Sequence, residues 1–271
     1  MPSYLITGVS RGLGFGFLKV LSADKNNTII GLVRDKKSTD AKVKEQLGDL
    51  DNVTILQADM LDYAALKAAV PVVEKITGGK LDYIIANAAW ASPWSAFRSI
   101  DSLAKEPEKL EEDYVYSFRV NVVGNVHLLN LFIPLVLKGD VKKVIHIASG
   151  QSSVDMIAKH DISIMTPYAA SKSAMNIVTS KFSGFYREQG VLFLSVAPGS
   201  KTSTDQYPVT DEIKANMAST GDKFKRYAPH FERDFTPEES VKEVLSVVER
   251  SSIGRGDAGQ FVSQFGNQQW L

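Results

Sequence analysis

The chain of 271 residues contains no cysteine, which excludes disulfide bonds, thiolate nucleophiles and cysteine-ligated metals. It has only four histidines, and their spacing is not that of a metal site: His127, His146, His160 and His230. A surplus of either charge is also missing, because 31 basic residues balance 31 acidic ones. The composition therefore favours no metal, no nucleic acid and no anionic membrane as a partner.

Long apolar runs are missing as well. No segment stays apolar for the roughly 18 residues that a membrane span needs, and the chain enters a strand-like run at Tyr4 without a basic leader. We therefore expect a protein of the cytoplasm. The length allows one large α/β domain or two small ones, and we find no linker or repeat. The sequence thus predicts a single domain over residues 1–271.

The first motif is a glycine-rich turn between a strand and a helix. The apolar run Tyr4–Ile6 leads into Gly8, Gly12 and Gly14, and apolar residues then return at helical spacing as far as Leu21. Such glycines let the backbone approach a pyrophosphate, whose charge the free N–H groups at a helix N-terminus bind. A plain tight turn is the alternative, but the position after a strand and before a helix favours phosphate binding.

The residues at the end of the second predicted strand, Thr28–Val33, indicate whether NAD or NADP binds. An acidic residue at this point binds the ribose 2′-hydroxyl of NAD, and an arginine binds the 2′-phosphate of NADP. Here Val33 occupies the acidic position and Arg34 follows it, while Arg11 can approach from the glycine turn. The run from Asp35 to Lys37 is equally compatible with a solvated loop. The pattern predicts NADPH.

Helices at about 39–47 and 63–75 alternate with strands at 53–56 and 81–86, which is typical of a parallel sheet with right-handed crossovers. Asp59 follows the third strand and is a candidate to accept from the adenine amino group. Asn87 follows the fourth strand, where a cofactor ribose passes. Either side chain could instead cap the turn that follows it.

The second half continues this alternation. We expect helices at about 107–137, with a late interruption at Pro134, at 168–188 and at 237–250, and strands at 144–147, 191–196 and 259–263. The stretches 152–166 and 199–236 show little periodicity and are expected to be loops, the second a substrate lid at about 200–236. The whole pattern predicts an α/β fold: a Rossmann-type, doubly wound parallel sheet of about seven strands in three α/β/α layers.

Tyr168 and Lys172 lie four residues apart near the start of the 168–188 helix and therefore share one face. A lysine cation close to a phenol lowers its pKa, and such a tyrosine can act as a general acid or base. A half-buried ring with the lysine stem lying over it is the alternative for this pair alone.

Six short motifs occur along the chain in a fixed order: Thr7-Gly8-x-x-x-Gly12-x-Gly14, Asn87-Ala88, Asn121, Ser149, Tyr168-x-x-x-Lys172 and Pro198-Gly199. This ordered set resembles the short-chain dehydrogenase/reductase superfamily from the first strand to the last. Within the superfamily the chain is most similar to carbonyl reductases of the fungal ketoreductase kind, related to those that reduce aromatic polyketides in fungal secondary metabolism.

The resemblance implies a catalytic set. Ser149 would hydrogen-bond the substrate carbonyl oxygen, Tyr168 would give it a proton, and Lys172 would lower the phenol pKa while binding the nicotinamide ribose. Asn121 would hold a water behind Lys172 in a proton relay. Considered singly, Ser149 could be a turn hydroxyl and Asn121 a polar residue tolerated inside a helix.

The expected function is NADPH-dependent reduction of a ketone or aldehyde to an alcohol without a metal. The alternatives are NAD-linked oxidation of a secondary alcohol by the same residues, or a nucleotide-sensing binding protein that has lost turnover. The predicted cofactor contacts are Gly8, Ser10, Arg11, Gly12, Leu13, Gly14, Arg34, Asp59, Met60, Asn87, Tyr168, Lys172, Pro198, Gly199 and Thr202.

Two departures from the family pattern concern the pocket. Ala89 stands where the family's Asn-Ala-Gly turn has glycine, and the spacing from Ser149 to Tyr168 is longer than usual. The two long helices, at about 107–137 and 168–188, carry more apolar residues than one stripe requires. We expect them to form the interface of a homodimer or homotetramer, unless both are simply well buried within one chain.

Overall fold

A parallel sheet of seven strands forms the centre of the computed structural model, which describes residues 1–199, 210–231 and 234–271. Its strands are β1 (Ser3–Thr7), β2 (Thr28–Val33), β3 (Val53–Gln57), β4 (Tyr83–Ala86), β5 (Lys143–Ile147), β6 (Leu192–Ala197) and β7 (Phe261–Ser263). They lie in the order β3-β2-β1-β4-β5-β6-β7. The predicted Rossmann-type sheet is confirmed, and all seven strands lie within two residues of their predicted bounds.

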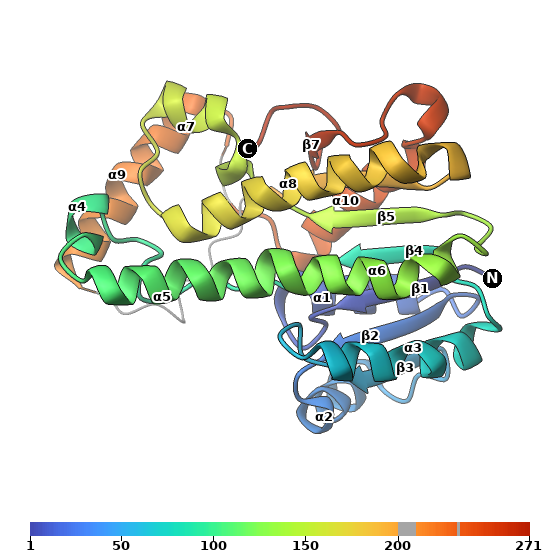
Figure 1. The fold of residues 1–271 in the computed structure, drawn as a ribbon. Coiled ribbons are helices and arrows are strands. Elements are labelled where there is room, and N and C mark those ends of the chain that lie inside the picture. The colour runs from blue at the N-terminus through green and yellow to red at the C-terminus, as the bar shows by residue number, and fades with distance from the viewer. Residues whose placement is uncertain (200–209, 232–233) are drawn as a thin grey trace.

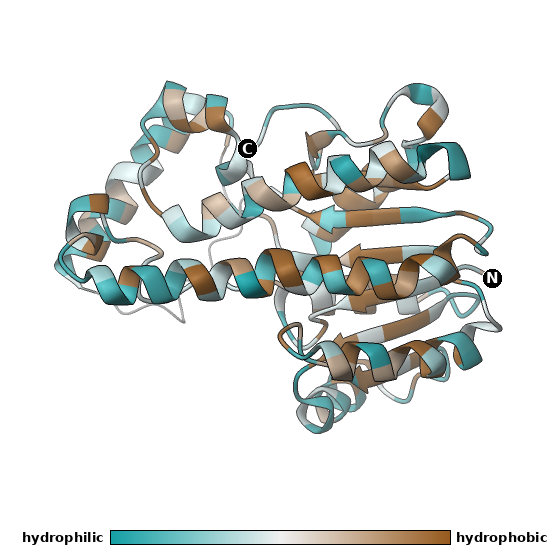
Figure 2. Ribbon diagram, in the orientation of Figure 1, coloured by the Kyte–Doolittle hydropathy of each residue, from teal (hydrophilic) through white to brown (hydrophobic). Residues whose placement is uncertain are grey.

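Helices cover both faces of this sheet (Figure 1). On one face, α1 (Gly12–Ser22), α2 (Lys36–Leu47) and α10 (Pro237–Arg250) pack over a buried cluster that includes Phe17 and Val244. On the other, α3 (Tyr63–Thr77), α6 (Gly124–Val136) and α8 (Thr166–Tyr186) cover a second cluster around Phe132 and Phe193. Figure 2 shows apolar strands between helices of mixed polarity, as expected when each helix buries one face and exposes the other.

Local signals fix several helix ends. Thr236 and Glu239 form a reciprocal capping box at the start of α10, which therefore runs over the predicted 237–250. Asp35 accepts from the backbone N–H of Ser38 at 2.9 Å and starts α2 at Lys36 rather than at Thr39. The first helical turns of α8 hold Pro167, whose missing N–H is not needed there.

The long helix predicted at 107–137 is present, but its interruption lies elsewhere. A π-helical turn, Arg119–Val123, joins α5 (Pro107–Phe118) to α6, and Pro134 sits inside α6 without ending it. By length and composition, the run Pro107–Val136 is apolar enough to cross a membrane, which the sequence reading did not expect. Half of its apolar stretch is buried in the fold, and the core helix of a globular protein can have the same length and composition.

Two stretches that we expected to be loops contain helices. The segment before α8 holds a short 3₁₀ turn, Gly150–Ser152, and α7 (Val154–His160), which begins where Ser153 accepts from the Met156 N–H. The expected lid holds α9 (Asp211–Tyr227), capped by Thr210, while residues 200–209 and 232–233 lie outside the described residues. Each helix buries few side chains, Met156 in α7 and Ile213 and Thr220 in α9, so few positions in the sequence mark its buried face. With α4 (Ile100–Leu103), these helices gather beyond the carboxyl ends of the strands (Figure 1).

Candidate active site

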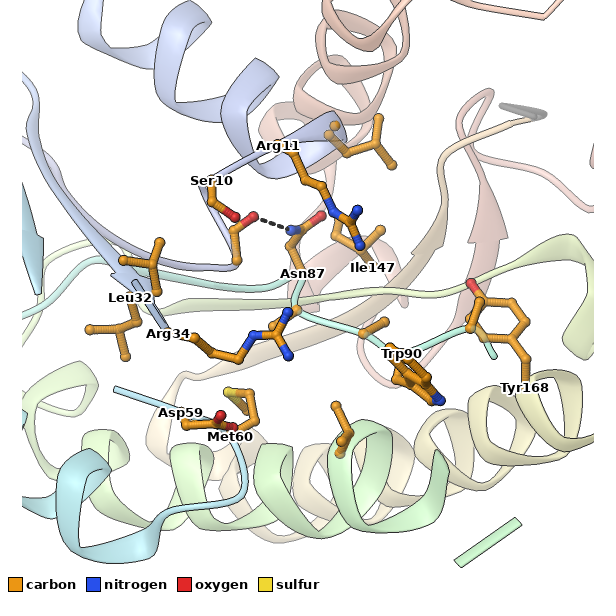
Figure 3. A pocket seen from close by; sticks show the side chains of 18 of the residues that line it. Ser10, Arg11, Leu32, Arg34, Asp59, Met60, Asn87, Trp90, Ile147 and Tyr168 are labelled. Atoms are coloured by element: carbon orange, nitrogen blue, oxygen red, sulfur yellow. Dashed lines mark hydrogen bonds between the residues drawn. The ribbon is translucent and has the colours of Figure 1, made fainter. Parts of the chain in front are cut away.

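The main cleft opens where the strand order reverses, between β1 and β4. Ligands of doubly wound sheets bind at this point, beyond the carboxyl ends of the strands. The cleft has a volume of about 490 Å³ and is lined by the glycine turn, by the residues after β2, β3 and β4, and by Tyr168 and Lys172 of α8 (Figure 3). The chain therefore brings polar residues from both halves of the sequence to one edge of the sheet.

The glycine turn has the geometry that its sequence predicted. Gly8 and Gly12 have φ of 74° and 59°, a region that favours glycine. A Cβ on Gly14 would lie 2.1 Å from the carbonyl oxygen of Gly8, so this residue serves the packing of α1 and does not line the cleft. The Asn87 side chain donates to the Thr7 carbonyl at 2.9 Å and thereby holds the turn against the end of β4.

Two arginines border the cleft where an adenosine ribose would lie. Arg11 comes from the glycine turn and Arg34 from the residue after β2, and their guanidinium groups point into the same space (Figure 3). Neither forms an ion pair within the described part of the chain. The Asp35 carboxylate, which would compete for Arg34, is occupied in capping α2. This end of the cleft is therefore cationic and suits a phosphate.

The residues after β3 combine two roles. Asp59 lines the cleft, and its Oδ1 also accepts from the Leu61 N–H at 2.9 Å, so the carboxylate shapes the turn as well. Met60 lines the cleft from the same turn, and its carbonyl oxygen lies 2.5 Å from where a Cβ on Gly124 would be. The glycine thus lets α6 pack directly against this wall.

Tyr168 and Lys172 differ sharply in exposure. Tyr168 borders the cleft, whereas Lys172 is 2% exposed, with its Nζ 5.9 Å from the centre of the Tyr168 ring. The ammonium donates to the carbonyl of Ile147, at the end of β5, at 2.6 Å. Burial lowers the pKa of Lys172 to about 7, because the charged form loses its hydration.

Ser149 and Asn121 are held by networks of their own. Ser149 begins the 3₁₀ turn after β5, and its Oγ accepts from the Gln151 N–H at 3.2 Å. Asn121 is fully buried in the π-helical turn, where its amide bonds the backbone N–H and carbonyl of Trp90 and the hydroxyl of Ser171. Asn121 therefore ties the segment after β4 to α8, and its role in a water relay stays a prediction.

A second cavity of about 330 Å³ adjoins the cleft. Leu13, Ala148, Tyr168 and Pro198 line both spaces. The second cavity also holds Ser149 and an apolar wall, to which α9 and the chain end contribute: Phe97, Met156, Ile164, Met165, Met217, Phe224, Trp270 and Leu271. Tyr168 thus borders both the cleft and the second, apolar cavity.

Residues 3–213 match the family model described as short chain dehydrogenase. The chain belongs to this family. It is 48% identical to the short chain dehydrogenase virK of Hypocrea virens and 45% identical to the short-chain dehydrogenase/reductase iacC of Pestalotiopsis fici, covering all of both chains. Among solved structures, the NADPH-bound carbonyl reductase from chicken fatty liver is similar in fold, with a TM-score of 0.79 at 24% identity, over 98% of this chain and 93% of the other.

Most of the predicted cofactor residues of this family member line the cleft together: Gly8, Ser10, Arg11, Gly12, Leu13, Arg34, Asp59, Met60, Asn87, Tyr168, Lys172 and Pro198. Gly14 lies beneath it, Gly199 lines the second cavity, and Thr202 is outside the described residues. That they contact a cofactor stays a prediction.

Sequence reasoning missed several residues that border the two spaces or lie next to them. Trp90 and Tyr116 pack edge to face, with ring centres 5.2 Å apart, and both line the cleft. Lys42 of α2 donates to the Ser10 carbonyl at 3.1 Å and adds a third cation beside the glycine turn. Trp270 reaches the second cavity from the end of the chain. None of these positions has a motif, because only folding brings them to the site.

Proposed function

We propose that this short-chain dehydrogenase reduces a ketone or aldehyde to an alcohol with NADPH and without a metal. The observation that carries the proposal is the position of Tyr168, which borders both the cleft and the apolar cavity, with the buried Lys172 close to its ring. A phenol at this junction can give a proton to a carbonyl oxygen that enters from the cavity.

Ser149, Tyr168 and Lys172 have separate roles in the proposed reaction. Ser149 presents a hydroxyl in the apolar cavity, where it can donate to the substrate carbonyl oxygen. Tyr168 donates the proton that this oxygen needs as the alcohol forms, and Lys172 supplies the neighbouring cation that favours the ionised phenol left behind. NADPH, when bound, supplies the hydride.

The cleft fits a phosphorylated dinucleotide. Its glycine turn offers backbone N–H groups at the start of α1, and Arg11 and Arg34 point into the same space (Figure 3). A planar guanidinium matches a phosphate with two parallel hydrogen bonds. The NADPH-bound state of the chicken carbonyl reductase supports the same choice of cofactor.

The second cavity indicates an apolar substrate. Methionine and aromatic side chains contribute to its apolar lining, and Trp270 stacks on Phe261 with ring centres 4.3 Å apart. Ser149 and Tyr168 both line this cavity and present hydroxyl groups to it, so a carbonyl on an apolar, ring-containing molecule fits both. We place this reaction in fungal secondary metabolism, which the relatedness to fungal short-chain dehydrogenases supports.

The test is the consumption of NADPH, followed by absorbance, with a panel of apolar aromatic and aliphatic ketones and aldehydes. We expect turnover with at least one aromatic ketone, and the alcohol as the product by mass spectrometry. Turnover of secondary alcohols with NAD⁺ but of no carbonyl with NADPH would instead support an alcohol dehydrogenase. Tight NADPH binding without turnover of either class would support a nucleotide-sensing protein.

A further inference from the structure

A buried histidine lies directly behind the lysine of the active site. His146 belongs to β5 and is 1% exposed, and its Nε2 lies 3.5 Å from Nζ of Lys172. Its other ring nitrogen, Nδ1, lies 3.3 Å from Oγ of Ser195 on β6, which is also 1% exposed. The mechanism proposed above does not use this imidazole, although it touches the ammonium that acts on Tyr168.

The surroundings of His146 select one protonation state and one tautomer. Burial, and then the charge of Lys172, lower the pKa of His146 well below its ordinary value, so the ring is neutral at physiological pH. A neutral imidazole has one N–H donor and one acceptor nitrogen, and an ammonium can only donate. Nε2 is therefore the acceptor for Lys172, and Nδ1 carries the hydrogen toward Ser195.

The same region is connected to the turn that carries Ser149. Asn176 lies one turn after Lys172 on α8, and its side chain partly opposes the lowering of the His146 pKa. Its Nδ2 donates to Oγ of Ser152 at 2.9 Å, and Ser152 donates to the carbonyl of Ser149 at 2.6 Å. Asn176 thus links α8 to the turn that carries Ser149.

The side chain of Asn121 is bonded to Trp90 and Ser171, whereas the imidazole of His146 lies 3.5 Å from Nζ of Lys172. We propose that His146 is a positioning residue for Lys172. Its neutral ring and the Ile147 carbonyl each accept from the ammonium, so that the remaining N–H is directed toward Tyr168 and the cleft. The catalytic consequence of this arrangement rests on the proposed function, but the arrangement itself does not.

Loss of the His146 acceptor should shift the pKa of Lys172, and with it the pH dependence of activity, in one direction. Lys172 is the charged group that acts on His146, and Tyr168 is the titratable group that faces Lys172 from the cleft. An acceptor beside the ammonium stabilises its charged form, so removal of the acceptor lowers the Lys172 pKa further below about 7. Activity that needs the cation is then lost at a lower pH than in the wild type.

The variants are His146→Leu, which removes the acceptor, and His146→Gln, whose Oε1 can replace Nε2. His127→Leu is the matched control, because His127 lies on α6 and its ring packs edge to face against Tyr63. The first readout is the NMR titration of Nζ in cofactor-free protein with ¹⁵N-labelled lysine, with the Lys172 signal assigned from a Lys172→Met sample. We expect Lys172 to titrate at a lower pH in His146→Leu and near the wild-type pH in the other two.

The second readout is the pH profile of kcat with NADPH and the best carbonyl of the panel. At neutral pH we expect kcat to fall by roughly 10- to 100-fold in His146→Leu, as for the loss of a hydrogen bond to a charged group. Its high-pH limb should move to lower pH, and His146→Gln should restore both. Thermal unfolding of each variant shows whether a fall in kcat results only from lower stability of the fold.

An unchanged Lys172 titration in folded His146→Leu would overturn the proposal, as would an equal loss of kcat in the Leu and Gln variants. A wild-type protein that turns over no carbonyl would overturn the proposed function instead. The NMR titration still decides the role of His146 in that case, because it uses neither cofactor nor substrate.

Discussion

Tyr168 borders the cleft and the apolar cavity, while Lys172, four residues later on the same helix, is almost completely buried. This difference in exposure suits their proposed roles, since the proton donor has to reach the substrate and the cation has to act at short range in a medium of low dielectric. The same residue types on an exposed helix would interact weakly through water.

Tyr168→Phe removes the phenol and leaves the ring. We expect kcat to fall by roughly 10²- to 10⁴-fold, the usual size of general acid catalysis, because only the proton donor is lost. NADPH affinity, measured by fluorescence titration, and the unfolding temperature should stay near the wild-type values. A variant that kept more than about a tenth of the activity would show that Tyr168 is not the acid.

Arg34→Ala tests the choice of cofactor. A charge-assisted hydrogen bond contributes about 1.5 to 3 kcal/mol, and each 1.4 kcal/mol is about tenfold, so kcat/KM for NADPH should fall by roughly 10- to 150-fold. The value for NADH should hardly change, because NADH has no 2′-phosphate. Lys37→Ala, an exposed cation of the same run, is the control and should affect neither cofactor. Equal losses with both cofactors would make Arg34 a structural residue.

At the scale of elements, the glycine turn and α1 depend on close backbone contact. Gly14→Ala places a methyl 2.1 Å from the Gly8 carbonyl oxygen, so the turn has to shift. We expect this variant to lose about 1 to 3 kcal/mol in the free energy of unfolding and to bind NADPH weakly. Both quantities are measurable by urea unfolding and fluorescence titration.

Gly184→Ala is the matched control for Gly14→Ala. Nothing lies within 4 Å of a Cβ built on Gly184, which is inside α8. This substitution should raise the free energy of unfolding by about 0.5 to 1 kcal/mol, because alanine loses less backbone entropy than glycine in a helix. Similar losses in both variants would mean that the close contact at Gly14 is not what matters.

Asp82 joins three elements at the amino-terminal edge of the sheet. Its carboxylate accepts from the Ser3 N–H and hydroxyl at 2.9 and 3.0 Å, and from the N–H groups of Asp140 and Val141 at 2.9 and 3.2 Å. Burial raises the pKa of Asp82, but these hydrogen bonds outweigh it and lower the pKa overall. The ionised form is therefore part of the folded state.

The lowered pKa of Asp82 predicts how stability depends on pH. A group with a lower pKa in the folded state stabilises above its unfolded pKa, about 3.9, and this contribution is lost as pH falls through the folded value. Asp82→Asn should cost about 2 kcal/mol of the free energy of unfolding at pH 7, with a smaller difference from wild type at pH 3. Asp140→Asn, which alters an exposed pair with Lys80, should change little at either pH. A constant difference across pH would contradict the role of the Asp82 charge.

At the scale of the whole molecule, two neighbouring helical segments expose apolar side chains. Ile177 and Phe185 of α8 are 63% and 72% exposed, and Val115, Phe118 and Val123 of α5 and the π-helical turn are also exposed. Residues 177 and 185 are eight apart and lie on one face of α8. We propose that this surface forms the contact between copies of the chain in a dimer or tetramer.

Sedimentation at micromolar concentration tests this association. We expect the wild type to sediment as a dimer or tetramer and Phe185→Glu to shift it toward the monomer, because the change places a charge in the contact. Val154→Glu, on the equally exposed valine of α7, should leave the mass unchanged. A monomeric wild type would show that these residues are merely exposed.

The sequence by itself determined the sheet, most helix positions and many of the residues that line the cleft. Period-two and period-3.6 patterns, glycine turns and caps are local, so Gly8, Thr236 and the Tyr168–Lys172 spacing could be interpreted from a few neighbouring residues. The ordered motifs then identified the family because each lies at the carboxyl end of a strand or on a helix beside it.

Only the tertiary structure decided what lies around these motifs. The helices α7 and α9 and the chain end at Trp270 contribute to the second cavity, although no local signal connects them to Ser149. His146 looks like one more strand residue in the sequence, and its contact with Lys172 exists because β5 and α8 pack together. Distance along the chain says nothing about such contacts, since they depend on burial and on which faces of two elements meet.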